Sequence, residues 1–380
     1  MSLLDGQEIN KETLEQTNPV FNTAKMTLFL LAGNGDPDAV AISNMLGLTL
    51  EETQNSTNST ASQEQVIAGA LNMESRFRSM GVLEAESGCP VHVDLPCGYT
   101  PRFIQDARAG RRYVGMDLPA VIADMEKVAA ALLSEEEKKL VSFKAVDATN
   151  FATLSAALDG VEGPLCITTE GLVMYFNDSE TEVFLNNIRM LLEKHGGCWI
   201  TADPEITLAY IMALRAVCGE RFMEVMNNAK QQATDKANTT VGGNKLMSLP
   251  PDIEGTMKGA MMLLAKHGMK AERKIIADNV PELVTPAKIP DQAEQYKANM
   301  KQCANWKVTL LNPSQRLDTS AVASQEFDAS AELQDGAMML NLKGRLDTMT
   351  APNLLAFYEQ NKENLQGVVV DCAQIGRAHV

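Results

Sequence analysis

The segment 94-DLPCGYTPRF-103 decides the fold, because it places a tight turn after the short apolar run 91-VHV-93. The next apolar run, within 111-RRYVGMDLPAVI-122, also ends in an aspartate followed by Leu-Pro. Ligands of doubly wound sheets bind outside the carboxyl ends of the strands. The turn at Gly98 and the acid at Asp117 therefore predict a ligand site.

The pattern around this segment alternates strands with helices. Such an order predicts a mostly parallel sheet covered on both faces, a doubly wound α/β fold. A helical N-terminal region (24–50, broken at 33–38, then 64–80) and a long helical insert from 204 to about 232 surround it, and the last two strands have the composition of an edge pair. The predicted strands are 91–95, 113–118, 141–146, 165–169, 199–202, 270–277 and 306–311.

The composition of the chain changes after Asn312. Residues 313–330 have few large apolar side chains and are typical of a linker, and 331–374 predict a second, small α/β domain with a helix at 351–365. The last six residues, 375-IGRAHV-380, match one reading frame of a widely used sequencing adapter. We interpret them as read-through at the end of a truncated sequence.

Composition limits the partners. The 380 residues carry a net charge of -16, which argues against nucleic acid and anionic membranes as partners. No apolar run is long enough to span a bilayer. The seven cysteines form no C-x-x-C pair, which favours reduced thiols and a cytoplasmic protein.

Three successive strand ends indicate the kind of ligand. Gly98 lets the backbone come close to it, and Asp117, about 20 residues further on, suits ribose hydroxyls. Asp147 would accept from an exocyclic amine. The turn lacks G-x-G-x-x-G, and residues 1–312 contain no Tyr-x-x-x-Lys, which argues against a nicotinamide-dependent oxidoreductase. An adenosine without phosphates indicates S-adenosylmethionine.

Four motifs carry a family resemblance: 94-DLPCGYTPR-102, 115-GMDLPAVI-122, 145-AVDATNF-151 and 168-TTEGLVMYF-176. Their order and spacing over 23–312 resemble the leucine carboxyl methyltransferase family and, more closely, the bacterial polyketide O-methyltransferases grouped with it. The resemblance implies a class I methyltransferase fold and S-adenosylmethionine as methyl donor. The family's glycine-rich first loop here reads Leu-Pro-Cys-Gly.

The resemblance also implies a set of cofactor-binding residues. Gly98 would lie under the methionine moiety, Asp117 would hold the ribose, Glu170 would face the cofactor's amino group, and either Arg76 or Arg78 would pair with its carboxylate. The full implied set is Arg76, Pro96, Gly98, Tyr99, Arg102, Asp117, Leu118, Asp147, Ala148, Glu170 and Gly171.

The catalytic residues are less defined. A carboxylate acceptor needs no base, whereas a hydroxyl or phenol benefits from one, and Tyr175 and Asp203 are the candidates at strand ends. Cys97 has no histidine placed to activate it, and Cys89, His92 and Cys97 fit no closed zinc site, so we predict no metal. We expect His92 to be a half-buried strand residue. Small-molecule and protein carboxylate acceptors both stay open.

The C-terminal segments 338-MMLNLKGRLDTMTAPNLLAFY-358 and 367-GVVVDCAQI-375 are similar to STAS domains, and the similarity covers about half a domain. It implies a regulatory module with an anti-sigma-type protein partner. The alternative hypothesis for the function of the whole chain is therefore a signalling protein, which senses S-adenosylmethionine or a similar nucleoside without turnover.

Overall fold

The computed structural model describes residues 19–48, 62–227, 244–248, 250–311, 328–334, 337–344 and 367–375. The chain divides into two compact units, Met1–Gln315 and Arg316–Val380. Within the described residues, no helix combines the length and the apolar character needed to cross a bilayer.

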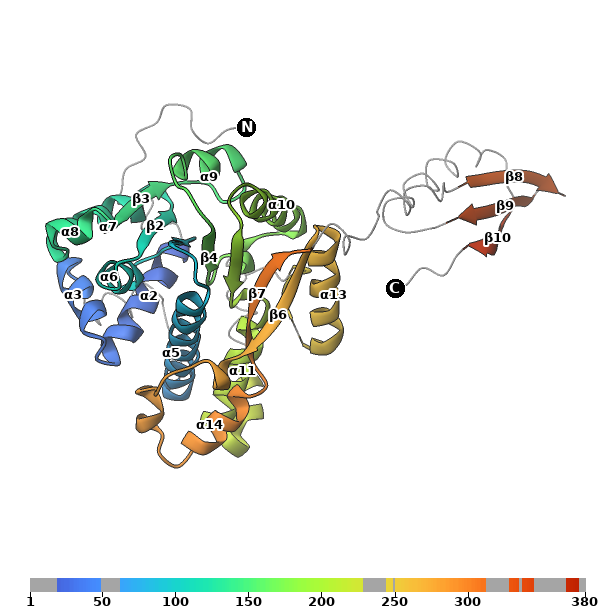
Figure 1. The fold of residues 1–380 in the computed structure, drawn as a ribbon. Coiled ribbons are helices and arrows are strands. Elements are labelled where there is room, and N and C mark those ends of the chain that lie inside the picture. The colour runs from blue at the N-terminus through green and yellow to red at the C-terminus, as the bar shows by residue number, and fades with distance from the viewer. Residues whose placement is uncertain are drawn as a thin grey trace. The chain divides into compact units, whose positions relative to one another are not determined.

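A seven-stranded sheet forms the centre of the first unit (Figure 1). Its strand order is β3-β2-β1-β4-β5-β7-β6; β7 is antiparallel to both β5 and β6, and the other neighbouring strands pair in parallel. The predicted α/β fold with a mostly parallel sheet is thus observed. The strands are β1 (Val91–Asp94), β2 (Arg112–Asp117), β3 (Val141–Ala145), β4 (Leu165–Thr169), β5 (Gly197–Thr201), β6 (Met269–Ile275) and β7 (Ala304–Leu310).

The expectation of an edge pair is confirmed: β6 and β7 pair with each other at one end of the sheet. Within this pair β6 is the outer strand, and β7 lies between β5 and β6. Trp306 and Val308 on β7 are fully buried. Their apolar character fits an interior strand, and a strand's neighbours cannot be inferred from its own composition.

Helices cover both faces of the sheet. Two of them, α8 and α9, are absent from the sequence-based prediction, because four and seven residues are too few to display a helical period. The helices are α2 (Pro19–Gly33), α3 (Pro37–Met45), α5 (Gln63–Glu86), α6 (Arg102–Arg108), α7 (Pro119–Leu132), α8 (Glu135–Lys138), α9 (Phe151–Ala157), α10 (Asp178–His195), α11 (Ile206–Cys218), α13 (Ile253–Lys266) and α14 (Ala293–Met300).

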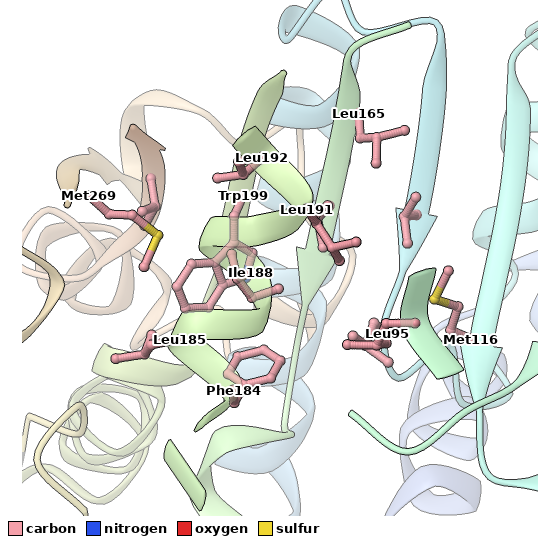
Figure 2. Packing of buried hydrophobic residues seen from close by; sticks show 14 of the residues in the cluster. Leu95, Met116, Leu165, Phe184, Leu185, Ile188, Leu191, Leu192, Trp199 and Met269 are labelled. Atoms are coloured by element: carbon pink, nitrogen blue, oxygen red, sulfur yellow. The ribbon is translucent and has the colours of Figure 1, made fainter. Parts of the chain in front are cut away.

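Alternate residues of a strand face opposite layers. On β5, Trp199 packs against α10, with its ring 5.7 Å from that of Phe184. Figure 2 shows the apolar stripe of α10 lying over this tryptophan. Cys198 and Ile200 point the other way, toward Met80 of α5. The core therefore has two layers, one on each face of the sheet.

The long helix α5 connects the sheet to the helices beyond the strand ends (Figure 1). Its C-terminal half packs on β4 and β5, whereas Ala68 and Leu71 in its N-terminal half pack with α11. The Tyr296 hydroxyl of α14 donates to the Leu71 carbonyl at 2.8 Å. The carboxylate of the buried Glu74 accepts from two backbone N–H groups, those of Val284 and Thr285. We call α2, the N-terminal half of α5 and α11 the cap.

The second unit contains a three-stranded sheet of order β10-β9-β8. β8 (Asp328–Gln334) and β9 (Ala337–Gly344) are antiparallel, and β10 (Gly367–Ile375) is parallel to β9. β8 begins inside the range predicted as linker. The predicted helix 351–365 and the tail residues 376–380 lie outside the described residues.

Candidate functional site

A cavity of about 340 Å³ lies at the carboxyl ends of β1, β2 and β4. The structure brings together at this cavity most of the residues that the sequence singles out. Those that line it are Arg76, Pro96, Gly98, Tyr99, Arg102, Asp117, Leu118, Glu170, Gly171 and Tyr175.

The turn after β1 is fixed by its neighbouring strands. Gly98 has φ +50°, a conformation that disfavours other residues, and its N–H donates to the Asp117 carboxylate at 2.8 Å. The Cys97 N–H donates to the Met116 carbonyl at 2.9 Å. The second carboxylate oxygen of Asp117 accepts from the Leu118 N–H at 2.7 Å. The Leu-Pro-Cys-Gly loop thus brings backbone to the cavity without a glycine-rich sequence.

Burial raises the pKa of Asp117 to about 6, although the two backbone N–H groups favour its charged form. A buried carboxylate with raised pKa gains from donors that approach its oxygens. The same burial raises the pKa of the Cys97 thiol well above its ordinary value, and this side chain packs in a hydrophobic cluster. Cys97 is therefore a small core residue and not a nucleophile.

Two arginines and one glutamate lie at another part of the cavity. Glu170 accepts from Arg76 at 3.2 Å and from Arg102 at 2.9 Å. Arg102 also lies over the Phe77 ring, 4.3 Å from its centroid. Arg78, the alternative to Arg76, instead donates to Asp36 at 2.9 Å and does not line the cavity. Geometry thus distinguishes two arginines that the sequence leaves equivalent.

Asp94 is a cavity residue that the sequence analysis missed as a site residue, although it ends β1. It is buried and accepts from the Thr168 hydroxyl at 2.8 Å and from the Tyr113 hydroxyl at 3.1 Å. The guanidinium of Arg102 lies 3.8 Å away. Burial raises its pKa, against Arg102 and the two hydroxyl donors. Its position after an apolar strand, equivalent to that of Asp117, was the available signal.

His92 is fully buried, not half-buried as expected. Its Nδ1 lies 2.5 Å from Asp106 and 3.3 Å from Glu84, and its Nε2 lies 2.7 Å from the Thr168 hydroxyl. The side chains of Glu84, His92 and Asp106 together would suit a metal ion. However, Arg111 already lies 3.0 Å from Glu84 and 2.6 Å from Asp106. The group is therefore an ion-pair network that supports Thr168 and, through it, the cavity.

Asp203 does not take the catalytic place considered for it. It is fully buried, and its carboxylate accepts from the N–H groups of Gly171, Leu172 and Val173. Burial raises its pKa in spite of these bonds. Asp203 is absent from the cavity wall and instead fixes the turn that carries Glu170.

Asp147 and Ala148 also lie outside the cavity wall. Asp147 is exposed and accepts from the N–H and hydroxyl of Thr149, and the Ala148 carbonyl accepts from Asn187 at 3.0 Å. Because β3 is an edge strand, its end lies beside β2 rather than over the cavity.

The other residues of the cavity wall come from the cap and from the turn after β4. They carry no charge, unlike the five charged residues near the strand ends, and no sequence motif identified most of them. We call this part of the wall the cap half of the cavity; it consists of Ala24, Thr27, Asn72, Met73, Met174, Tyr175, Ile206, Thr207 and Tyr210. The sheet half consists of the other residues of the wall: Arg76, Asp94, Pro96, Cys97, Gly98, Tyr99, Thr100, Arg102, Asp117, Leu118, Val121, Glu170 and Gly171.

Comparisons with known proteins give similarity at the level of structure. No protein-family model matches the chain, and no curated protein matches it in sequence. Solved structures similar to it include a DUF574 family protein from Streptomyces avermitilis (13% identity, TM-score 0.42, 76% of this chain and 97% of that one). The methyltransferase domain of a bacterial CtHen1 is also similar (13%, TM-score 0.38, 63% and 100%).

A third similar structure is magnesium protoporphyrin IX methyltransferase from Synechocystis with bound S-adenosylhomocysteine (9% identity, TM-score 0.36, 66% of this chain and 86% of that one). At such identities the likeness concerns the overall fold alone. The assignment of a function therefore depends on the cavity.

Proposed function

We propose that this chain is an S-adenosylmethionine-dependent O-methyltransferase. The observation that carries the proposal is the joint placement of Gly98, Asp117 and Glu170 at the ends of β1, β2 and β4, around one cavity. Methyltransferase-type strand order, and methyltransferases among structures with a similar fold, support the same class.

The charges of the sheet half suit the methionine part of this cofactor. That part carries one carboxylate and one ammonium group. Arg76 and Arg102 would pair with the carboxylate, and Glu170 with Asp94 would accept from the ammonium. These two cations and two anions match a zwitterion, and Asp117, the third carboxylate of the wall, would face the ribose instead.

The nucleoside part would lie further along the strand ends. Asp117 would accept hydrogen bonds from the ribose hydroxyls, and these bonds would be stronger because the carboxylate is buried. Leu118 is 39% exposed although it lines the cavity, and it offers an apolar surface for the adenine ring. Pro96, Tyr99 and Gly171 would complete the contacts. Asp147 and Ala148 would approach the adenine from outside the cavity wall.

When bound, the cofactor supplies an electrophilic methyl group on a sulfonium. The contribution of the protein is to hold the methyl acceptor in line with it and to exclude water. Tyr175 lies in the cap half and would contact the acceptor. Because the Asp203 carboxylate already accepts hydrogen bonds from the backbone of the 171–173 turn, it would act only by positioning Glu170.

Within this class, the four motifs favour the leucine carboxyl methyltransferase family and the polyketide O-methyltransferases grouped with it, with a small-molecule acceptor. For the second unit we propose a STAS-type regulatory module that binds an anti-sigma-type protein. Its support is the sequence pattern, together with the parallel pairing of β9 and β10, which requires a long crossover connection. A cytoplasmic location fits this function.

The test is calorimetric titration of the full chain with S-adenosylhomocysteine. We expect micromolar binding in the wild type and loss of binding in Asp117→Ala with an unchanged circular dichroism spectrum. A folded wild type that does not bind the nucleoside would contradict the proposal. A panel of phenols and carboxylic acids is then tested for methyl transfer from labelled S-adenosylmethionine. If the protein binds the nucleoside but methylates no member of the panel, the alternative function, a sensor without turnover, is favoured.

A further inference from the structure

His92 on β1 is a buried side chain that no step of the proposed function uses. Its ring has polar partners on both sides. Nδ1 lies 2.5 Å from a carboxylate oxygen of Asp106 and 3.3 Å from one of Glu84, and Nε2 lies 2.7 Å from the Thr168 hydroxyl. A histidine ring with two such partners is neutral or charged, and the protons available to its partners decide which.

These protons can be counted. The Thr168 hydroxyl has one proton, which it donates to the Asp94 carboxylate at 2.8 Å. Its oxygen therefore accepts from Nε2 of His92, and Nε2 carries a proton. On the other side of the ring, the carboxylates of Asp106 and Glu84 are acceptors, so Nδ1 carries a proton as well. A ring with both nitrogens protonated is an imidazolium.

The same protons have a second arrangement, in which a protonated Asp94 donates to the hydroxyl and the hydroxyl donates to a neutral His92. The neighbouring charges oppose it. The Arg102 guanidinium, 3.8 Å from Asp94, favours the ionised carboxylate. Burial alone would lower the pKa of His92, but Glu84 and Asp106 raise it above its ordinary value. Burial also raises the pKa of Asp94, so this carboxylate depends on its donors to stay charged.

Charge balance favours the imidazolium too. Arg111 lies 3.0 Å from Glu84 and 2.6 Å from Asp106, so one guanidinium faces two carboxylates. With a charged His92, two cations match the two anions. A neutral ring would leave one carboxylate charge uncompensated in a buried site, which is costly.

The hydrogen-bonded contact continues from Asp94 to the cavity. Asp94 and Arg102 both line the cavity wall. Arg102 in turn donates to Glu170 at 2.9 Å. Thr168 and His92 are absent from the wall, so they can influence it only through Asp94.

We propose that His92 is an imidazolium and a positioning residue of the cofactor site. Through the Thr168 hydroxyl it holds Asp94 as an ionised carboxylate, and Asp94 fixes Arg102 beside Glu170. This inference rests on the proposed function, in which Arg102 and Glu170 hold the methionine part of the cofactor. It adds a residue that touches neither the cofactor nor the methyl acceptor.

The first measurement is nitrogen NMR of the full chain, labelled in its histidine rings, without nucleoside at about pH 7.5. We expect both ring nitrogens of His92 to be protonated, and His92→Gln identifies the signal by its loss. His195 and His267 are internal references, because burial lowers the pKa of both rings, which should be neutral at this pH. A singly protonated His92 ring overturns the inference.

The second measurement tests the link to the cavity by calorimetric titration with S-adenosylhomocysteine. Thr168→Val removes the hydroxyl at similar volume and should weaken binding about fivefold or more, the factor that one buried hydrogen bond contributes. Thr168→Ser keeps the hydroxyl and should stay within about twofold of wild type. The inference is overturned if Thr168→Val binds as tightly as wild type, or if both variants lose affinity equally.

The third measurement is a double-mutant cycle in the same titration. His92→Gln should weaken binding by a factor similar to that of Thr168→Val, and the double variant should lose little more than either single one, because both changes break one chain of contacts. Additive losses would contradict this chain. If His92→Gln fails to fold, the Thr168 variants still decide.

Failure of this inference can be separated from failure of the proposed function. If the folded wild type does not bind S-adenosylhomocysteine, the proposed function fails and the positioning role fails with it. If the nucleoside binds, and the ring protonation or the Thr168 variants contradict the expectation, only the role of His92 is wrong.

Discussion

The two halves of the cavity satisfy their polar groups in different ways. In the sheet half, every described carboxylate has partners: Asp117 accepts from two backbone N–H groups, Asp94 from two hydroxyls, and Glu170 from two arginines. In the cap half, charge is absent and the Asn72 oxygen has no partner. The comparison indicates a preformed set of charged groups beside an uncharged surface.

The largest expected effect is in the sheet half. We expect Asp117→Ala to weaken S-adenosylhomocysteine binding by at least about 100-fold, because it removes two hydrogen bonds to a charged acceptor. Calorimetry measures the affinity, and thermal unfolding verifies that the variant is folded. A folded variant with wild-type affinity would mean that the ribose is not held at the end of β2.

The two arginines of α5 offer a matched pair. Arg76→Met should weaken S-adenosylhomocysteine binding roughly tenfold to thirtyfold, since a charge-assisted contact is lost. Arg78→Met, two residues away and paired with Asp36 outside the cavity, should stay within about twofold of wild type. The same calorimetric titration applies to both, and the reverse order of effects would exchange the roles given to the two residues.

The raised pKa of Asp117 predicts a pH dependence of the sheet half. The ionised carboxylate accepts ribose hydroxyls, so nucleoside affinity should fall as pH drops below about 6. The cap half has no described carboxylate, so it should add no pH dependence of its own. Titrations of the wild type and of Asp117→Asn with S-adenosylhomocysteine at pH 5 and pH 7.5, each about one unit or more from the pKa, measure the effect; an equal change in both proteins would contradict it.

The same pKa has a consequence for stability of the protein without ligand. The folded protein binds this proton more tightly than the unfolded chain, whose value is near 3.8, so the Asp117 contribution to stability is lost as pH rises from 3.8 through about 6. The loss is on the order of 2 kcal/mol. Asp117→Asn is the control, because it cannot titrate. Urea unfolding measures the free energy of unfolding of both proteins at pH 4 and pH 7. Between these pH values it should fall by about that amount more in the wild type than in Asp117→Asn. An equal change in the two proteins would contradict the assignment.

The smallest effect is expected at the end of β3. Asp147→Ala should weaken nucleoside binding less than about threefold, because the side chain is exposed and bonded to Thr149, outside the cavity wall. Its sequence context resembles that of Asp117, so the pair compares similar motifs at different places in the sheet. A loss as large as that of Asp117→Ala would show that the adenine depends on this residue.

Much of the sheet half was predictable from sequence because strand ends carry local signals. An apolar run followed by an acid identified Asp117, and a glycine in the turn identified Gly98. Glu170, after β4, came from the family resemblance instead. Asp94 has this signal too and was overlooked, and Asp203 has it but bonds to the turn beside it.

The sequence by itself determined the alternating order of strands and helices, the α/β class and the strand-end acids, because hydrophobic period and turn chemistry act over a few residues. Only the tertiary structure placed Arg76 rather than Arg78 at the cavity, set β7 between β5 and β6, buried His92 among charges, and brought Asn72 to the same cavity as Asp117. These outcomes depend on contacts between segments far apart in the chain, and helical spacing on α5 does not reveal which side chains will face a cavity formed with α2 and α11.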